Sequence, residues 1–460
     1  MNYDVVIGLE IHSELNTATK IFCRCPNGVG EPNAHVCPVC LGLPGGLPVV
    51  SRAVIEKSIT AGLAFDCKIN PLTVFERKNY FYPDLPKGFQ TSQNDFPICL
   101  GGHIKLRNGR TIRLNRIHIE EDAGKLVHDE VRLETLIDFN RGGTPLIEMV
   151  TEPDITSSDE AVEFLEEVRS RLLFSGVSNA RMEEGELRFD VNISLKKPTS
   201  KTLGNRVELK NLNSFKVVAK AIEFEIKRQS ALLDNGRKVD VETRKWNEAK
   251  EISTSMRSKE TSVDYRYFPD PDQYPIKIKP SDIARIRSAL PKLAHELRSD
   301  FVKLGLPEYD ADILTRDHTI AKFFTDCVKL FNRPKEVSNW VMVDCMSRAK
   351  NSRIELSPRQ LAKVIELVTT NKVTRKNSPL LLDALWGTKD EPQDVAKKLG
   401  LFGGVTESEL EKIIDDLIAQ NPKAVADKAI TFLMGKIMKQ TAGKADAALA
   451  RNMIICKFPK

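Results

Sequence analysis

The sequence predicts an α+β domain with a mainly antiparallel sheet, followed by all-α helical domains. Between Met1 and about Pro280, short alternating runs such as TIRLNRIHI and LRFDVNISL are separated by turn residues. These runs outnumber the helical patterns among them, which disfavours a doubly wound parallel sheet. Beyond the proline-rich stretch DYRYFPDPDQYPIKIKPSD, nearly every pattern has apolar residues at helical spacing.

A chain of 460 residues exceeds what one hydrophobic core usually serves, so several domains are expected. The composition shift at the proline-rich stretch and a second break near DEPQDVAKKLGLFGGVT divide it into three. The expected domains are residues 1–290, 291–395 and 396–460, the last a small helical tail.

The first expected strand, VVIGLEIHSEL, has an unusual polar face. Alternation places Ile7, Leu9 and Ile11 on one side and Glu10 and His12 on the other. A half-buried strand with a solvated outer face explains this pattern as well as a ligand site does.

Helix signals are clearest where a capping residue precedes a periodic run. In SSDEAVEFLEEVRSRLLFSG, Ser157 or Ser158 can cap the helix and Gly176 can end it. The stretches SDIARIRSALPKLAHELRSDFVKLG, SPRQLAKVIELVTTN and TESELEKIIDDLIAQNP each begin with a capping residue and are also expected to be helical.

The overall charge and hydropathy indicate which partners and which cellular location to expect. A net charge of +6 and a pI near 8.7 permit a partner that carries phosphates, although so mild an excess is also ordinary. No apolar run reaches the length of a membrane helix and no targeting segment opens the chain, so a cytoplasmic location without a membrane partner is expected.

Four of the nine cysteines have metal-site spacing. Cys23-x-Cys25 is followed after eleven residues by Cys37-x-x-Cys40, a pattern that can present four thiolates to structural zinc. The alternative is a set of free or redox-active thiols.

Acidic residues form a second candidate group. Glu120, Glu121 and Asp122 end one alternating run, and Glu148 lies within an apolar stretch, where an unpaired carboxylate is costly. Each could be a salt-bridged structural residue. With Glu10 and His12 they could instead form a divalent-metal site that holds nucleotide phosphates.

Basic residues beside aromatic or polar ones suit phosphate binding by Lys78, Arg188 and Lys210, and the pattern around Lys78 equally suits an ordinary loop with aromatic anchors. No P-loop, dinucleotide fingerprint or protein-kinase motif set is present. Any use of ATP would therefore depend on a cleft of metal ions and carboxylates.

Several motifs together resemble one family. They are VIGLEIHSEL, CPVCLGLPGGLPV, RKNYFYPDLPKGFQ, RIHIEEDAGKLVHD, NRGGTPLIEMVTEPD, EEGELRFDVNIS, LKNLNSF and SMRSKETSVDYRYFPDPD. In this order they resemble the GatB family, the B subunits of the glutamyl-tRNA(Gln)/aspartyl-tRNA(Asn) amidotransferases. The resemblance implies a cradle domain with a fold like that of glutamine synthetase and the guanido kinases.

The same resemblance implies an activity and its participants. GatB-type proteins use ATP to phosphorylate the side-chain carboxylate of glutamate or aspartate mischarged on tRNA(Gln) or tRNA(Asn). Ammonia released by the amidase, the A subunit of the complex, then reaches the cradle, and the small C subunit completes the heterotrimer. A misacylating aminoacyl-tRNA synthetase is a further conceivable partner.

Motif by motif, the resemblance implies Mg²⁺ ligands that are also the catalytic residues, namely Glu10, His12, Glu121 and Glu148. It carries the zinc site over to Cys23, Cys25, Cys37 and Cys40, and Lys78, Arg188 and Lys210 remain candidates for binding ATP or substrate phosphates.

Two other functions are open from the residues alone. The cysteines, the aromatic loop and the basic tail would equally suit a non-catalytic zinc-bearing scaffold that binds RNA. Acidic pairs also allow a hydrolase that uses general acid–base catalysis. The basic tail residues, expected to contact tRNA or merely to solvate a bundle, are Lys436, Lys439, Lys444, Arg451, Lys457 and Lys460.

Overall fold

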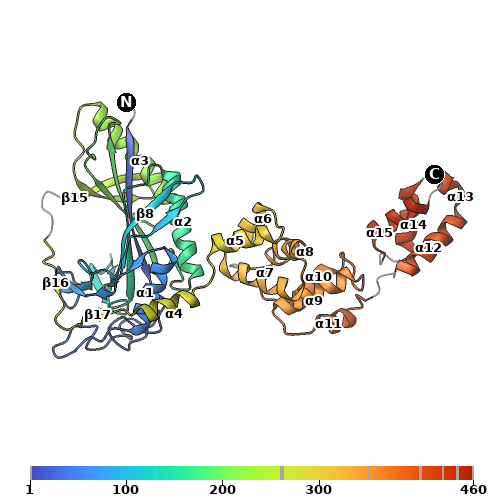
Figure 1. Cartoon of the computed structure of the whole chain (residues 1–460), viewed down its shortest axis with the longest axis horizontal. Coiled ribbons are helices and arrows are strands. Elements are labelled where there is room, and N and C mark those ends of the chain that lie inside the picture. Colours follow the sequence, from blue (N-terminus) through green and yellow to red (C-terminus); the bar gives the residue numbers. More distant parts are fainter. Residues whose placement is uncertain are drawn as a thin grey trace. The chain divides into compact units, whose positions relative to one another are not determined.

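The computed structural model describes residues 3–129, 131–258, 264–350, 353–402, 407–426, 429–441 and 445–457. The chain divides into two compact units, Met1–Leu293 and Ala294–Lys460. The first combines a large sheet with helices and the second is helical (Figure 1). The α+β class expected from the sequence is confirmed.

One ten-stranded sheet organises the first unit, with the strand order β15-β14-β13-β12-β1-β11-β8-β6-β2 and β7 paired to β8. All its pairings are antiparallel except β13 with β14. Its strands are β1 (Asp4–Glu14), β2 (Lys68–Ile69), β6 (Cys99–Leu100), β7 (His103–Lys105), β8 (Thr111–Glu121), β11 (Pro145–Thr151), β12 (Leu187–Lys196), β13 (Val207–Leu212), β14 (Glu242–Asn247) and β15 (Ile252–Ser258).

Short strands form three smaller sheets beside the large one. These are β3 (Leu72–Thr73) with β17 (Ile276–Lys277); β4 (Glu76–Asn79) with β5 (Phe89–Ser92) and β16 (Phe268–Pro269); and β9 (Lys125–Asp129) with β10 (Glu134–Asp138).

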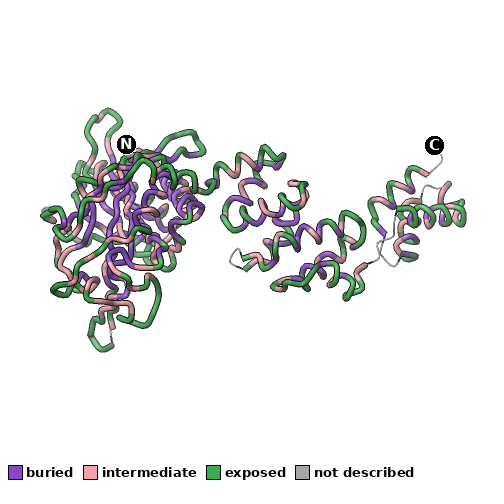
Figure 2. Tube along the Cα trace, turned by 60° about the horizontal axis from the view of Figure 1, so that its bottom comes forward, coloured by how far each residue is buried: buried purple, intermediate pink, exposed green. Residues whose placement is uncertain are grey.

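Three helices accompany the large sheet. Helices α1 (Arg52–Ala64) and α3 (Phe215–Asp234) contact its strands, and α2 (Ser158–Phe174) packs against both helices. Figure 2 shows the buried residues concentrated in the interior of this unit.

The first strand, β1, has the alternation that the sequence predicts. Ile7, Leu9 and Ile11 are fully buried, whereas Glu10 and His12 keep partial exposure. Successive side chains of a strand point to opposite faces, so the polar face of β1 is the less covered one.

The predicted helix around residue 165 is α2. Ser157 caps it by accepting a hydrogen bond from the Glu160 N–H, and Gly176 follows its end with a φ of +69°. A positive φ suits glycine because it has no Cβ to clash. Both local signals read from the sequence are thus used by the fold.

The stretch SDIARIRSALPKLAHELRSDFVKLG is not one helix. It splits into α4 (Pro280–Ala289) and α5 (Ala294–Lys303), with Pro291 in the break. Proline lacks an N–H and clashes with the preceding turn, so the helix is interrupted at Pro291. The helical spacing of apolar residues nevertheless continues across this break in the sequence. Ser357, by contrast, caps the next predicted helix with a full capping box.

The described residues of the second unit form two separate hydrophobic clusters. The first draws on buried residues from Phe301 to Ala396 and is flanked by Leu401 and Phe402; the second runs from Leu410 to Ile454. The further elements are α6 (Glu308–Leu314), α7 (His318–Leu330), α8 (Pro334–Asn339), the π-helical turn η1 (Trp340–Cys345), α9 (Pro358–Thr369), α10 (Ser378–Leu385), α11 (Pro392–Lys398), α12 (Glu407–Gln420), α13 (Pro422–Ala426), α14 (Ile430–Gln440) and α15 (Ala447–Lys457).

The division at Leu293 lies close to the expected boundary at 290, whereas the further boundary at 395 stays a prediction. Thr406, the expected cap of α12, and the tail residues Lys444 and Lys460 lie outside the described residues. Within the described part of the chain, every helix is too short or too polar to cross a membrane.

Candidate functional site

Strand register brings four polar side chains into one row across the large sheet. His12 on β1 is opposite Glu148 on β11, and Glu148 is opposite His118 on β8. On the other side of β1, His12 is opposite Arg188 on β12. Directly paired residues point to the same face of a sheet, so sequence positions far apart converge here.

The centre of the row is the Glu148 carboxylate. Its Oε2 lies 3.3 Å from the Nε2 of His12 and 3.3 Å from the Nε2 of His118. Glu120, two residues beyond His118 on β8, lies 3.2 Å from the same His118 nitrogen. One ligand atom each from His12, Glu120 and Glu148 fit within 4.8 Å of one another, a spacing that a single metal ion can bridge.

Neighbouring groups fix the Glu120 carboxylate. The Gln90 side-chain amide donates to Oε2 at 3.1 Å and the Ser92 hydroxyl donates to Oε1 at 2.8 Å, both from β5. Such donors orient a carboxylate and leave fewer of its conformations to be lost on binding a ligand. This cluster of His12, Glu120 and Glu148, with His118 behind it, is called the histidine–glutamate cluster below.

The electrostatics of the cluster favour ionised carboxylates. Burial alone would raise the pKa of Glu148, but His118 and His12 hold it well below the usual glutamate range. Burial likewise opposes protonation of His118, yet Glu148 and Glu120 raise its pKa to about 9. The cluster is therefore anionic at its carboxylates, as a binding site for a cation requires.

Glu121 does not join this cluster, although the resemblance implies that it is a Mg²⁺ ligand. Its Oε1 pairs with the Lys87 ammonium and accepts the Thr91 N–H at 2.8 Å. Successive residues of a strand point to opposite faces, so Glu120 and Glu121 cannot both face His12. The structure gives the position near His12 to Glu120.

Glu10 belongs to a second acidic group on the same side of the sheet. Oxygen atoms of Glu10, Asp190 and Glu208 also lie within 4.8 Å of one another. Burial, followed by the charge of Glu148, raises the pKa of Glu10, and Asn192 donates to it at 2.9 Å. The four predicted ligands thus fall into two neighbouring groups and one separated residue.

Lys210 lies within the second acidic group. Its ammonium pairs with Asp190 and lies 3.1 Å from Glu208. Although burial opposes it, these two carboxylates raise the pKa of Lys210. The ammonium therefore remains a counter-charge to this group and stands near the position a cation would take.

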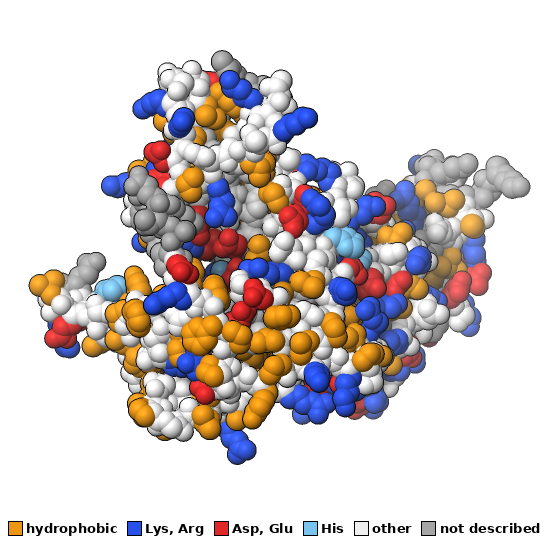
Figure 3. Space-filling model, turned by 60° about the vertical axis from the view of Figure 1, so that its left-hand side comes forward, with side chains coloured by type: hydrophobic (Ala, Val, Ile, Leu, Met, Phe, Trp, Pro, Cys, Tyr) orange, Lys and Arg blue, Asp and Glu red, His pale blue; other side chains and the backbone are white. Residues whose placement is uncertain are grey.

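The other two basic candidates also lie near the histidine–glutamate cluster. Burial would lower the pKa of Lys78, but the charges of Glu120, Tyr267 and Glu148 raise it. Arg188, at the end of the polar row, donates to Asp122 Oδ2 at 2.6 Å. Figure 3 shows acidic side chains gathered in a hollow of this unit, with basic side chains at its margins.

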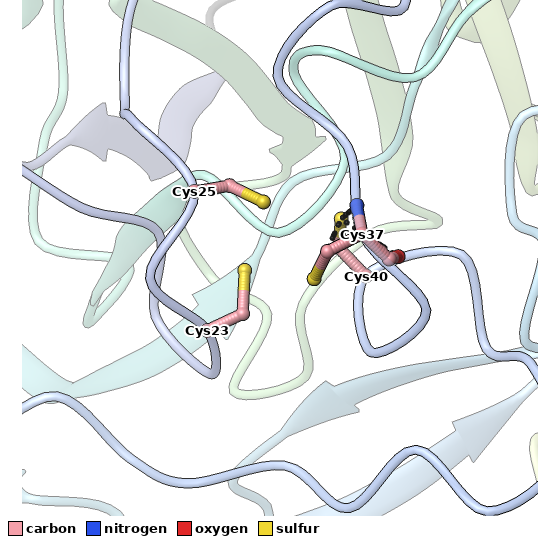
Figure 4. Close-up of side chains that lie close together, drawn as sticks. All are labelled: Cys23, Cys25, Cys37 and Cys40. Atoms are coloured by element: carbon pink, nitrogen blue, oxygen red, sulfur yellow. Dashed lines mark hydrogen bonds between the residues drawn. The ribbon is translucent and has the colours of Figure 1, made fainter.

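The four cysteines of the predicted metal site come together. Cys23 and Cys25 lie on one loop and Cys37 and Cys40 on another, and their side chains point toward one another (Figure 4). All four sulfurs lie within 4.8 Å of one another, and those of Cys37 and Cys40 are 3.9 Å apart. Tetrahedral zinc with bonds of about 2.3 Å requires sulfur separations of about 3.8 Å, so the cluster fits a structural metal.

One thiol of the cysteine cluster is strongly polarised. A hydrogen bond from Cys23 lowers the pKa of Cys40 to about 5; burial opposes this, and the Cys37 N–H and the Lys20 charge assist. A thiolate is the form that binds metal. Nothing in this group is placed to act on a substrate, because a four-cysteine site has no open coordination position.

A cavity of about 340 Å³ adjoins the cysteine cluster on the Glu121 side. Its lining includes Lys20, Cys23, Cys40, Arg77, Lys87 and Glu121. None of the histidine–glutamate cluster lines it. The peptide that joins Glu120 to Glu121 therefore has the cluster on one side and the cavity on the other.

Sequence reasoning missed His118, Asp190 and Glu208 as parts of these groups. His118 lies in RIHIEED at the same alternation phase as Glu120, which was the available signal. For Asp190 and Glu208 the signal was weaker, because only the pairing of β12 with β1 and β13 brings them to Glu10.

Known proteins are similar to this chain along almost its whole length. The family described as the GatB/GatE catalytic domain matches residues 5–284, and the family described as the GatB domain matches residues 322–457. The B subunit of the aspartyl/glutamyl-tRNA(Asn/Gln) amidotransferase of Thermoanaerobacter pseudethanolicus is 45% identical, with 99% of each chain covered. Those of Caldicellulosiruptor saccharolyticus (45% identical; 99% and 98% covered) and Geotalea daltonii (42%; 100% of each) are similar.

Proposed function

Because this chain belongs to the family of aspartyl/glutamyl-tRNA(Asn/Gln) amidotransferase B subunits, we propose that it activates a carboxylate carried on tRNA and lets ammonia replace the activating group. The substrates would be glutamate on tRNA(Gln), aspartate on tRNA(Asn), or both. The observation that carries this proposal is the polar row of His118, Glu148, His12 and Arg188 across one sheet face.

The reaction explains why such a row is needed. A free carboxylate is a poor electrophile, since its leaving group would be oxide. When bound, ATP supplies a phosphoryl group that makes this oxygen a leaving group, and Mg²⁺ neutralises the phosphate charge. The protein's part is to position the negatively charged phosphate and carboxylate groups of the substrates and to compensate their charge.

The donor sets fit hard divalent ions. His12, Glu120 and Glu148 would hold one ion, and Glu10, Asp190 and Glu208 a second, because carboxylate oxygens are the preferred ligands of Mg²⁺. Imidazole is an uncommon ligand for Mg²⁺ and suits Mn²⁺ better, so the first site should accept both. His118 would keep Glu148 and Glu120 in place from behind.

The basic residues would bind phosphate oxygens. Lys78 is held near Glu120 and Glu148, where an ammonium can bind an anion that arrives with its metal. Arg188 is oriented by Asp122, and its planar fork suits phosphate or carboxylate. When a cation binds to Asp190 and Glu208, the Lys210 ammonium would leave these carboxylates and pair with a phosphate oxygen instead.

Family membership supports a proposal about the partners and the location. We propose a heterotrimer with the amidase, or A, protein and the small C protein, in the cytoplasm, with ammonia delivered from glutamine hydrolysis. The cavity beside Glu121 would serve as a route by which ammonia approaches β8. A zinc ion on the four cysteines would fix the loops that form one wall of this cavity.

Family membership is also the basis for two proposals about the domains. The first unit would share the fold of glutamine synthetase and the guanido kinases, as a cradle for the reaction. Residues 396–460 would form a separate tail that binds the body of the tRNA. Lys457 would contribute less than the other tail lysines, because it is paired with Glu411 and Asp415.

The experiment is ATP hydrolysis by the chain co-purified with the amidase and the small C protein. Glu-tRNA(Gln) and Asp-tRNA(Asn) are compared with their uncharged forms, and Glu120→Gln with its matched neighbour Glu121→Gln. We expect stimulation by at least one charged tRNA, its loss in Glu120→Gln, and only a few-fold change in Glu121→Gln.

Two outcomes would contradict the proposal in different ways. No stimulation by any charged tRNA, from a complex whose glutaminase still works, would favour the zinc-bearing RNA-binding scaffold. Loss of activity in Glu121→Gln with full activity in Glu120→Gln would keep the function and reject the cluster proposed for it.

A further inference from the structure

Lys20 is a lysine with no solvent exposure, in the segment between β1 and the first cysteine pair. Its ammonium donates to the carbonyl oxygen of Phe139 at 3.2 Å and lies 3.8 Å from the Cys40 sulfur. A buried ammonium needs a compensating negative charge, and a carbonyl supplies only a dipole. The Cys40 sulfur is the nearest group that can supply a full charge.

Carboxylates do not serve this purpose. Glu121 lines the same cavity as Lys20, but it is paired with Lys87. Among the residues that the structure describes, Lys20 has no carboxylate within ion-pair distance. The lysine is therefore better matched to an anionic sulfur cluster than to any acidic side chain.

The backbone holds Lys20 in register with the cluster. Its N–H donates to the carbonyl oxygen of Cys25 at 3.0 Å, and Thr19 forms a β-bridge with Pro26. The ammonium thus approaches Cys40 from one side while the main chain of the same residue is fixed to the other cysteine loop. The backbone contacts with the Cys25 loop therefore determine the position of the Lys20 side chain.

We propose that Lys20 is a positioning residue of the four-cysteine metal site, whose ammonium offsets part of the charge of the bound thiolates and thereby raises the affinity for a divalent metal. Four thiolates around a divalent ion carry a net charge of −2, which burial penalises. A hydrogen-bonded ammonium reduces this to −1. The inference rests on the zinc site of the proposed function.

The test compares Lys20→Met, which keeps the length of the side chain and removes the charge, with Lys57→Met. Lys57 is a suitable control because its ammonium also donates to a backbone carbonyl, that of Gly176, without a cysteine partner. The affinity of the full chain for Zn²⁺ is measured by competition with a chromophoric chelator, and Co²⁺ absorption reports the thiolate environment.

We expect Lys20→Met to bind Zn²⁺ about 10- to 100-fold more weakly, the usual effect of removing a partner of a metal ligand, and Lys57→Met to match the wild type. The melting temperature adds a second readout. After metal removal, Lys20→Met should differ less from the wild type than with zinc bound, because the charge of four metal-bound thiolates is then absent.

Equal zinc affinity in Lys20→Met and the wild type would overturn the inference and leave the zinc site intact. An equal loss of melting temperature with and without zinc, or failure to fold in both states, would show a purely structural role and would also overturn it. If the wild type itself bound no zinc, the metal site and the inference would fail together.

Discussion

The two units of the chain differ in what they bury. In the described part of the first unit, twelve Asp, Glu, Lys, Arg or His side chains are almost inaccessible to solvent: Lys20, Glu76, His118, Glu120, Glu121, Asp122, Glu160, Arg171, Glu208, Glu225, Glu242 and Asp270. In the described part of the second unit, Asp344 is the one buried carboxylate, and no lysine, arginine or histidine is buried there.

This difference distinguishes a unit whose buried charges suit catalysis from a unit built as a helical scaffold. Burying a charge costs free energy even when it is paired, so a fold that keeps many such groups gains something other than stability. Perturbed groups of this kind concentrate at functional sites. The second unit fits the opposite pattern, with apolar cores and charges paired on its helical surfaces.

The largest expected effect falls on the first unit, at Glu148. Glu148→Gln removes the charge that both His12 and His118 contact, while it keeps the size of the side chain. We expect tRNA-stimulated ATP hydrolysis by the assembled complex to fall at least about 10³-fold, equivalent to about 4 kcal/mol of barrier. Retention of a tenth of the wild-type rate would argue against the cluster as the reaction site.

The second unit should respond to loss of its buried charge through stability alone. Asp344 pairs with Arg375 at 2.6 Å, and the Arg375 guanidinium lies 3.7 Å from the Trp340 ring centroid. Asp344→Asn should lower the free energy of unfolding by about 2 kcal/mol, since Arg375 is half exposed and part of the cost is screened.

The matched control is Asp383→Asn, which breaks an exposed pair with Arg348 and should cost under about 0.5 kcal/mol. Thermal unfolding of the second unit within the full chain measures both variants. A fall in the rate of ATP hydrolysis at saturating substrate, in Asp344→Asn but not in the control, would blur the distinction between the two units.

The tail sharpens the comparison through binding. Truncation after Phe402 keeps Leu401 and Phe402 against their helical core and removes the separate cluster from Leu410 to Ile454. We expect tRNA affinity to fall about 10-fold with a shallower salt dependence, because exposed lysines such as Lys436 and Lys439 would no longer release counterions.

Ammonia-dependent turnover by the truncated complex at saturating tRNA should persist, since the tail is proposed to contact the tRNA body. Filter binding across a salt series measures the slope. Equal slopes for the truncated and complete chains would mean that the tail lysines only solvate a helical bundle.

The smallest effect is expected at a buried charge of the first unit that has a structural role. Glu160, at the start of α2, accepts hydrogen bonds from Arg110, Asn108 and Thr156. Although burial opposes it, the Thr156 and Asn108 hydrogen bonds and the Arg110 charge lower the pKa of Glu160.

A lowered pKa in the folded state stabilises the fold above the unfolded-state value of about 4.3, and this contribution disappears as the pH falls through the folded-state pKa. Glu160→Gln should therefore cost about 1 kcal/mol at pH 7 and nothing near pH 2. Melting temperatures at the two pH values measure the difference. A pH-independent cost would indicate lost packing rather than lost charge.

Local signals carried much of the fold prediction. Ser157 and Gly176 delimit α2 because capping and positive φ are properties of a few adjacent residues. The boundary near 290 follows from a similar local change of composition. The helical pattern across Pro291 is confirmed, but as the two helices α4 and α5, because apolar periodicity persists where proline interrupts the backbone.

For the site, the sequence by itself determined the polar face of the first strand and the assembly of the four cysteines. Both follow from short-range rules, namely the two-residue period of a strand and the spacing of metal ligands. The tertiary structure decided that Glu120 rather than Glu121 lies beside His12, and that Glu10 belongs with Asp190 and Glu208. Those choices depend on the register between paired strands, some of them more than a hundred residues apart, where a shift of one residue turns every side chain to the other face.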